Sequence, residues 1–179
     1  NIEAYKQTGG TAVTATIVEE AWNHQSYYGN PSMIKWTKKA DGSFTFDYTW
    51  YDKWIQRWID HDVLDPEKGI GEIQCYSIVP WGNVLTYMDE ATGETVKQAY
   101  TPGSEEWNTI WRTFLEDFMK HTEEKGWLDI TYISMDERGL SELEPAVDLN
   151  QLKVRVVKHL KSFQHLIIKV NQIMNSQIK

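Results

Sequence analysis

Three short apolar runs, separated by longer polar stretches, constrain the fold of this chain most strongly. The runs occupy residues 11–18, 70–79 and 129–135. They are rich in β-branched residues and nearly continuous in apolar character, as strands buried on both faces of a sheet are. Strands of this kind lie parallel and are covered by helices. The sequence therefore predicts an α/β fold built on parallel strands.

Two stretches between these runs repeat apolar residues every three or four positions, as the buried face of a helix does. They cover residues 49–61 and 104–125. The second stretch opens on Ser104, a favoured N-cap residue, and closes at Gly126, a favoured residue just past a helix end. A further helix is expected to begin near Pro145. Helices and strands thus alternate along the chain.

The connections that follow the strands are long, and those that follow the helices are short. Residues 26–48 and 84–103 are the two longest, and the second has a hairpin signal at 91–93. Long connections after the strands are typical of a (β/α)8 barrel, whose site lies at that face. A closed barrel needs about 200 residues or more, whereas this chain has 179. We therefore expect an incomplete TIM-like barrel of three to four βα units, or a small open sheet.

Polar and aromatic side chains follow each of the three runs, and parallel strands bring such ends to one edge of a sheet. They are Trp22, Asn23, His24 and Gln25, then Tyr76, Trp81 and Asn83, then Asp136, Glu137 and Arg138. Amides, indoles and carboxylates suit a carbohydrate better than a metal or a phosphate, and the chain has no phosphate-loop or Cys-x-x-Cys motif. Nine Trp and nine Tyr supply flat faces for sugar rings, although most are expected in the core.

Asp136 and Glu137 form one of six adjacent acidic pairs in the chain, so their position at the end of the apolar run 129–135, rather than the pairing itself, carries the argument. Neighbouring strand residues point to opposite faces, so two carboxylates can share a pocket only where the strand ends. They lie too close together to act as an inverting acid and base, which stand ~6.5–9.5 Å apart. They suit a reaction in which the substrate's own acetamido oxygen is the nucleophile. The alternative is a surface acid pair bound by Arg138.

The run from Trp107 to Gly139, above all F-M-K-H-T-E-E-K-G-W-L-D-I-T-Y-I-S-M-D-E-R, resembles the catalytic domain of glycoside hydrolase family 123. The segments T-I-V-E-E-A-W-N-H-Q and C-Y-S-I-V-P-W-G-N resemble its earlier strand ends. The resemblance covers residues 1–148. It implies a (β/α)8 barrel, usually preceded by a β-sandwich, and an exo-acting β-N-acetylgalactosaminidase that uses substrate-assisted retaining hydrolysis and no cofactor.

The same resemblance assigns roles to individual residues. Asp136 matches the residue that stabilises the acetamido group, and Glu137 matches the general acid. The substrate-binding residues would be Trp22, His24, Tyr76, Trp81 and Asn83. The sandwich, the first strand and about half of the barrel have no counterpart, so we expect a truncated chain with weak activity or none.

Charge divides the chain near residue 148. Residues 149–179 hold six Lys or Arg and no acids, which leaves 12 basic and 26 acidic residues, a net charge of −14, in residues 1–148. An acidic surface of this kind disfavours nucleic acid. We expect 1–148 to be the partial hydrolase barrel and 149–179 a basic tail. Apolar residues recur with helical spacing over 150–178, which predicts one amphipathic helix, and the tail is alternatively an out-of-frame translation product.

The expected partner is a glycan with terminal β-GalNAc, and the resemblance suggests a secreted or periplasmic bacterial protein, although no signal peptide is recognisable here. No apolar run reaches the ~20 residues of a membrane helix. The lone Cys75 excludes an internal disulfide. Two alternatives stay open: a non-catalytic carbohydrate-binding or oligomerising domain, and a family 20-like β-N-acetylhexosaminidase, which also uses an adjacent Asp-Glu pair.

Overall fold

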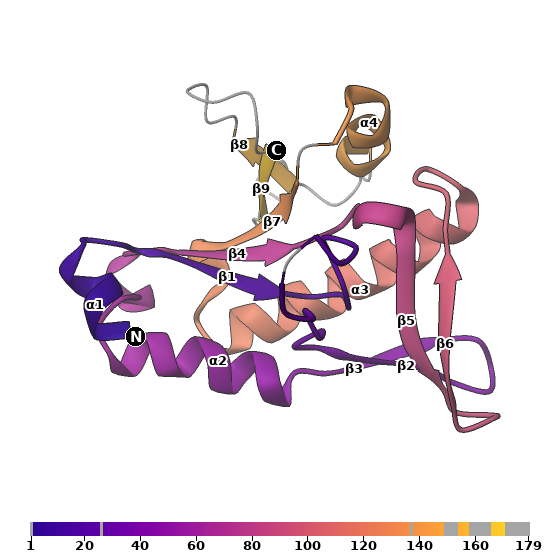
Figure 1. Ribbon diagram of the computed structural model, residues 1–179, viewed down its shortest axis with the longest axis horizontal. Helices are drawn as coiled ribbons and strands as arrows, with labels where there is room; N and C mark the ends of the chain where they lie inside the picture. The colour runs from indigo at the N-terminus through magenta and orange to yellow at the C-terminus, as the bar shows by residue number, and fades with distance from the viewer. Residues whose placement is uncertain (1, 26, 137, 149–153, 158–165, 171–179) are drawn as a thin grey trace, which may run out of the picture.

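The frame of the molecule is a sheet that contains three parallel strands. The computed structural model describes residues 2–25, 27–136, 138–148, 154–157 and 166–170. The strands β1 (Ala12–Thr16), β4 (Glu72–Tyr76) and β7 (Thr131–Met135) are hydrogen-bonded neighbours in that order (Figure 1). Each lies inside or at the edge of one of the three apolar runs. The α/β fold with parallel strands that the sequence predicts is therefore confirmed.

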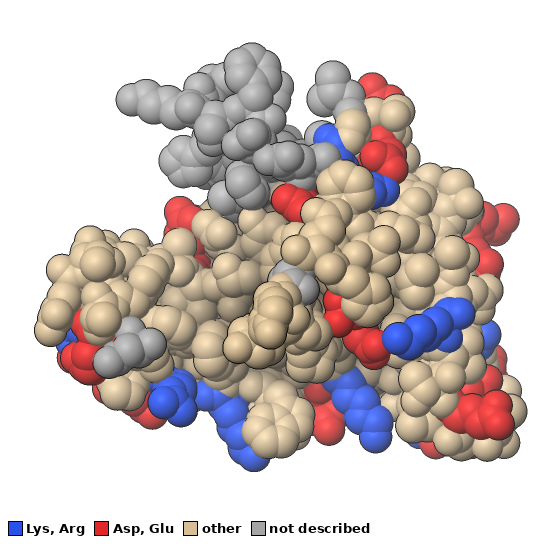
Figure 2. All heavy atoms as spheres, viewed as in Figure 1, with Lys and Arg blue, Asp and Glu red and all other residues tan. Residues whose placement is uncertain are grey.

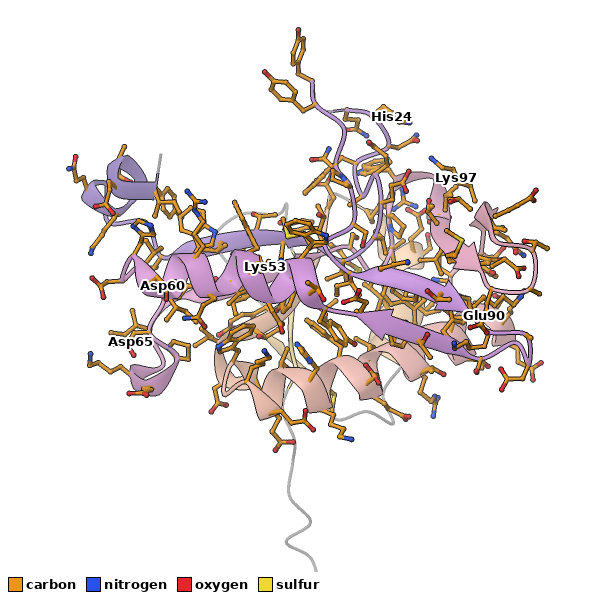
Figure 3. All side chains as sticks on the ribbon, turned by 90° about the horizontal axis from the view of Figure 1, so that it is seen from below. His24, Lys53, Asp60, Asp65, Glu90 and Lys97 are labelled. Atoms are coloured by element: carbon orange, nitrogen blue, oxygen red, sulfur yellow. The ribbon has the colours of Figure 1, made fainter. Side chains whose placement is uncertain are left out.

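Two helices cover one face of this sheet, as Figure 3 shows from below. They are α2 (Thr49–Asp60) and α3 (Glu105–Glu124), close to the predicted bounds. The Ser104 hydroxyl accepts a hydrogen bond from the Trp107 amide at 3.2 Å and so caps α3. The His121 ring lies 2.7 Å from the Asp52 carboxylate, which joins the two helices. A short helix, α1 (Ile2–Gln7), precedes β1.

The two long connections are not loops, because each contains a hairpin. The first holds β2 (Lys35–Lys38) and β3 (Phe44–Asp47), and the second holds β5 (Val84–Asp89) and β6 (Glu94–Ala99). The strands β2 and β5 pair in parallel, so the hairpins form one mixed sheet in the order β3-β2-β5-β6. The hairpin expected at 91–93 is confirmed, and β2 is an element that the sequence did not predict.

Trp36 of β2 lies at the centre of the core between the two sheets and α3. It is 2% exposed, and its ring stacks on Phe114 with centroids 4.6 Å apart. Its indole N–H donates to the Ile17 carbonyl at 2.8 Å, which satisfies a polar group at the end of β1. Trp107, Trp111 and most of the other Trp side chains are also buried or partly buried, as expected for an aromatic core.

Exposed ion pairs such as Lys6–Asp62 and Lys97–Glu19 connect elements at the surface. In Figure 2, basic and acidic side chains are interspersed over the face in view. Exposed pairs contribute little to stability, so the aromatic core is the main support of the fold. Cys75 is fully buried, and burial raises the pKa of its thiol to about 12. Among the described helices, none is both long and apolar enough to cross a membrane.

The last part of the chain differs from the expectation. Strands β8 (Val154–Val157) and β9 (Leu166–Val170) replace the helix predicted over 150–178, and β9 pairs antiparallel with β7. The helix prediction is therefore wrong for these residues, because their β-branched runs suit a strand beside an open sheet edge. The other residues of 149–179 lie outside the described part, and the out-of-frame origin stays a prediction.

Four shorter elements complete the fold. Helix α4 (Leu140–Asp148) begins after Gly139 and contains Pro145 in its interior, so the expectation that Pro145 begins a helix is wrong. The helix begins earlier because the Glu142 carboxylate accepts from the Gly139 amide at 3.3 Å. Three single turns of 3₁₀-helix precede strands: they cover Pro66–Lys68, Trp81–Asn83 and Leu128–Ile130.

Candidate active site

The segments that follow β1, β4 and β7 meet at one edge of the sheet. The Trp81 backbone amide donates to the Ala21 carbonyl at 3.0 Å, which joins the segments after β4 and β1. The Trp81 indole N–H donates to Asp136 Oδ2 at 2.7 Å, which joins the segments after β4 and β7. Asp136 is partly buried. Three segments that are far apart in the sequence thus place a carboxylate among aromatic side chains.

Arg138 holds this edge together from the side of β7. Its guanidinium donates to Asn83 Oδ1 at 3.1 Å and forms an ion pair with Glu142. It also lies over the Trp81 ring, 4.6 Å from the centroid. The Arg138 side chain is only 6% exposed, and its Nε atom is buried with no hydrogen-bond partner among the residues that the structure describes. In the described residues, the ion-pair partner of Arg138 is therefore Glu142 rather than Asp136.

Trp22 and Tyr76 form an aromatic wall beside the carboxylate. Their ring centroids are 5.2 Å apart and the rings are tilted by 34°. Burial, and then the negative charge of Asp136, raise the pKa of the Tyr76 hydroxyl. Tyr76 therefore keeps its proton at neutral pH and remains a hydrogen-bond donor next to Asp136. Trp22 is partly exposed, so part of its surface is open to a ligand.

His24 lies on the loop after β1, which projects from the body of the molecule well away from Asp60 and Asp65 (Figure 3). Glu20, Asn23 and His24 all have positive φ angles, of 52°, 48° and 60°. The Glu20 carboxylate stabilises this strained loop, because it accepts from the Asn30 amide at 2.9 Å and the His24 amide at 3.3 Å. The His24 side chain is 75% exposed and its ring lies 3.3 Å from Glu20.

Replacing Glu20 by glutamine is expected to make stability less dependent on pH under acidic conditions. The amide of Asn30, above all, lowers the pKa of the Glu20 carboxyl from its usual 4.5. A lowered folded-state pKa gives stability that is present above pH 4.5 and is lost as the pH falls through the folded-state value. Urea unfolding between pH 7 and pH 3 measures the difference. Glu19→Gln is the matched control, because Glu19 pairs with Lys97 instead. If Glu20→Gln lost as much stability between pH 7 and pH 3 as the unsubstituted chain does, the role given to Glu20 would be contradicted.

Two exposed tyrosines at this edge were not singled out from the sequence. Tyr27 is 95% exposed and Tyr28 is 78% exposed, and their rings meet edge to face with centroids 4.9 Å apart. The stretch from Ala21 to Ile34 contains no Asp, Glu, Lys or Arg, in a chain that is 25% charged. A charge-free aromatic stretch after a strand was therefore the available signal for a ligand-facing loop.

The structure brings together Trp22, Tyr76, Trp81, Asn83 and Asp136 of the predicted site, with His24 at its rim. Glu137 lies outside the described residues, so its role remains a prediction. No cluster of three or more His, Cys, Asp or Glu that could hold a metal ion occurs in the part of the chain that the structure describes. The assembled groups are one carboxylate, several aromatic faces and uncharged donors, which suit a neutral sugar.

A well-defined hollow of the surface lies elsewhere. It has a volume of about 930 Å³ and is bordered by Asp62, Lys68 and Trp127, which precede β4 and β7 in the sequence. It is therefore at the opposite edge of the sheet, where the strands begin. Active sites of α/β folds lie where the strands end, so the edge with Asp136 is the better candidate.

Comparison with known proteins identifies the family of this chain. A family model described as the catalytic domain of glycoside hydrolase 123 matches residues 1–168. A solved structure of a family 123 glycoside hydrolase from Clostridium perfringens, studied for glycolipid glycan hydrolysis, is 56% identical with a TM-score of 0.81. The match covers 83% of this chain and 26% of that chain. This chain thus spans about a quarter of the length of that relative. A search of curated proteins gave no match.

Proposed function

Because the chain belongs to glycoside hydrolase family 123, we propose that the edge formed by β1, β4 and β7 is part of a site that hydrolyses terminal β-linked N-acetylgalactosamine from a glycan. One observation carries the proposal: the Asp136 carboxylate stands at the end of β7 with one oxygen, Oδ2, held by the Trp81 indole. The other oxygen is the one we assign to the substrate. Because the chain belongs to family 123, the alternative of a family 20-like enzyme is dropped.

The proposed reaction uses the acetamido group of the substrate as its nucleophile. Asp136 accepts the acetamido N–H and stabilises the positive charge that develops there. The acetamido oxygen forms a bond to the anomeric carbon while the bond to the leaving oxygen breaks, and Glu137 donates a proton to that oxygen. Water then attacks the anomeric carbon, gives its proton to Glu137 and restores the acetamido group. Two displacements at one carbon retain its configuration.

We also propose that β1, β4 and β7 are part of a (β/α)8 barrel, with residues 1–148 as the barrel portion and 149–179 as a distinct tail. The strand order follows the chain order, helices cover the sheet, and polar side chains gather at the ends of the strands, as in such barrels. The antiparallel pairing of β9 with β7 departs from a barrel, which requires a parallel neighbour. The proposal therefore concerns the three parallel strands.

Changing the acetamido group of the substrate is the direct test. We expect slow release of nitrophenol from 4-nitrophenyl β-N-acetylgalactosaminide, and a rate lower by roughly tenfold or more for the trifluoroacetamido analogue, a barrier higher by about 1.4 kcal/mol or more. The fluorines withdraw electrons and weaken the acetamido oxygen as a nucleophile. Proton NMR of the first-formed sugar should show the β anomer. Equal rates for the two substrates, or inversion, would contradict the mechanism.

A binding function without catalysis is the second candidate, and the exposed rings of Tyr27 and Tyr28 favour it. Aromatic rings open to solvent can stack on sugars without any acid or base nearby. Calorimetric titration with N-acetylgalactosamine, together with the rate assay, separates the two functions. Binding that Asp136→Ala leaves unchanged, with no hydrolysis, would support the binding function.

A further inference from the structure

Trp81 is of the residue type that stacks on sugar rings, but protein groups already occupy its polar atom and one face of its ring. Its indole N–H is bonded to Asp136, and the Arg138 guanidinium lies over the ring. The Asn83 amide oxygen is likewise taken by Arg138. Arg138 thus contacts both Asn83 and Trp81, and Trp81 in turn contacts the Asp136 carboxylate, so this chain of contacts leads to Asp136 rather than to a ligand.

We propose that Trp81, Asn83, Arg138 and Glu142 form a clamp that fixes the orientation of the Asp136 carboxylate, and that Trp81 and Asn83 are positioning residues rather than sugar-binding ones. The inference rests on the proposed function, because it assumes that Asp136 receives the acetamido group. It adds which residues set the geometry of that carboxylate.

The clamp determines which carboxylate oxygen faces the substrate. A hydrogen bond of 2.7 Å from a neutral donor to a carboxylate is short and directional. It stops the carboxylate from rotating about its last bond and directs Oδ1 away from Trp81. A fixed acceptor is needed because the acetamido group must be aligned with the anomeric carbon before the oxygen attacks.

Arg138 in turn fixes the plane of the indole. Its side chain is 6% exposed, and a buried guanidinium requires paired partners, which Glu142 and Asn83 supply. One guanidinium thus joins the end of β7, the start of α4 and the turn after β4. Its positive charge over the ring withdraws electron density from the indole, which makes the N–H a stronger donor to Asp136.

The distribution of charge in the clamp also suits the reaction. Arg138 forms its ion pair with Glu142, and Asp136 is held by a neutral N–H instead. Within the described part of the chain, the negative charge of Asp136 is therefore not balanced by a direct guanidinium contact. It remains available for the positive charge that develops on the acetamido nitrogen.

The first test needs no ligand. In a chain labelled with ¹⁵N at tryptophan, Trp81→Phe identifies the indole signal of Trp81 among the nine. Asp136→Ala and Arg138→Lys are both expected to move this signal and to speed its exchange with solvent, because each removes a part of the clamp. Arg57→Met and Trp50→Phe, on the exposed face of α2, should leave it unchanged. A Trp81 signal that neither clamp variant moves would overturn the proposal.

The second test separates positioning from stacking. Trp81→Phe keeps a smaller aromatic face and removes the N–H together with the five-membered ring, so a residue that only stacks on the sugar should largely tolerate it. We expect this variant to bind GalNAc-thiazoline, a mimic of the cyclised intermediate, roughly tenfold more weakly or worse, and to bind GalNAc with less than about a threefold change. Equal losses for both ligands, or no loss, would overturn the positioning role. Failure of the unsubstituted chain to bind the thiazoline would contradict the proposed function instead, while the indole signal still decides whether the clamp exists.

Discussion

Replacing Trp36 by alanine is expected to lower the free energy of unfolding by about 3–5 kcal/mol, the usual cost of removing a large buried aromatic side chain. The substitution opens a cavity against Phe114 and Trp111, whose ring centroids lie 4.6 and 5.5 Å away. It also leaves the Ile17 carbonyl without the indole N–H. Domains are stable by only about 5–15 kcal/mol, so this variant should lose a large part of its stability.

Urea unfolding followed by circular dichroism measures this loss, provided that the slope of the free energy of unfolding against urea concentration is the same for the variant and the unsubstituted chain. Trp36→Phe keeps much of the packing and removes the hydrogen bond. Its free energy of unfolding should therefore lie between those of the unsubstituted chain and of Trp36→Ala. Trp50, which is 69% exposed on α2, is the matched control, and Trp50→Ala should change stability by less than about 0.5 kcal/mol. Similar losses for Trp36→Ala and Trp50→Ala would show that the core is not centred on Trp36.

Replacing Asp136 by asparagine is expected to lower kcat/KM by about 10²–10³, the typical effect of removing one preorganised electrostatic contact in the transition state. The amide has no negative charge to stabilise the acetamido cation. Glu137→Gln should have an effect that depends on the leaving group. A dinitrophenol departs without a proton and should be released almost normally, whereas an alkyl alcohol needs the acid and should be released far more slowly.

Initial rates with a series of aryl and alkyl β-N-acetylgalactosaminides measure both effects. Glu124→Gln, at an exposed position near the end of α3, is the matched acidic control and should have no effect. Where turnover is too slow to measure, the chain can replace the matching quarter of the Clostridium perfringens enzyme, with the same variants. An Asp136→Asn protein with unchanged kcat/KM would remove Asp136 from the mechanism.

The parallel frame could be predicted from the sequence because its signals are local. The three strands are continuous apolar runs, and α2 and α3 have apolar stripes at helical spacing. The strand β2 has no such signal, because its residues Lys35–Lys38 include a single large apolar side chain, Trp36. It becomes a strand through pairing with β3 and with β5, a partner some fifty residues away.

The end of the chain shows the limit of periodicity as a signal. Apolar residues over 150–178 fit a helical stripe, yet Val154–Val157 and Leu166–Val170 also fit short β-branched strands. The free edge of β7 decides between the two patterns, and that edge exists only in the folded molecule.

The candidate site likewise has one part that the sequence predicts and one part that only the folded structure shows. Parallel strand ends predicted that Trp81 and Asp136 would lie near each other. The position of Arg138 over the Trp81 ring depends on the turn at Trp81–Asn83 and on Glu142 in α4, and neither leaves a pattern in the sequence.

The pairing of β2 with β5 has a consequence for anyone who wishes to redesign this protein. Barrel enzymes are often retargeted by grafting one loop from a relative, on the assumption that the loops are independent modules. Here the two hairpins share backbone pairs between Thr37 and Met88 and between Lys38 and Asp89, and an ion pair joins Lys39 to Glu90. A graft of one hairpin would leave the other with an open, unpaired edge. The two hairpins therefore form one structural unit, and they should be exchanged together.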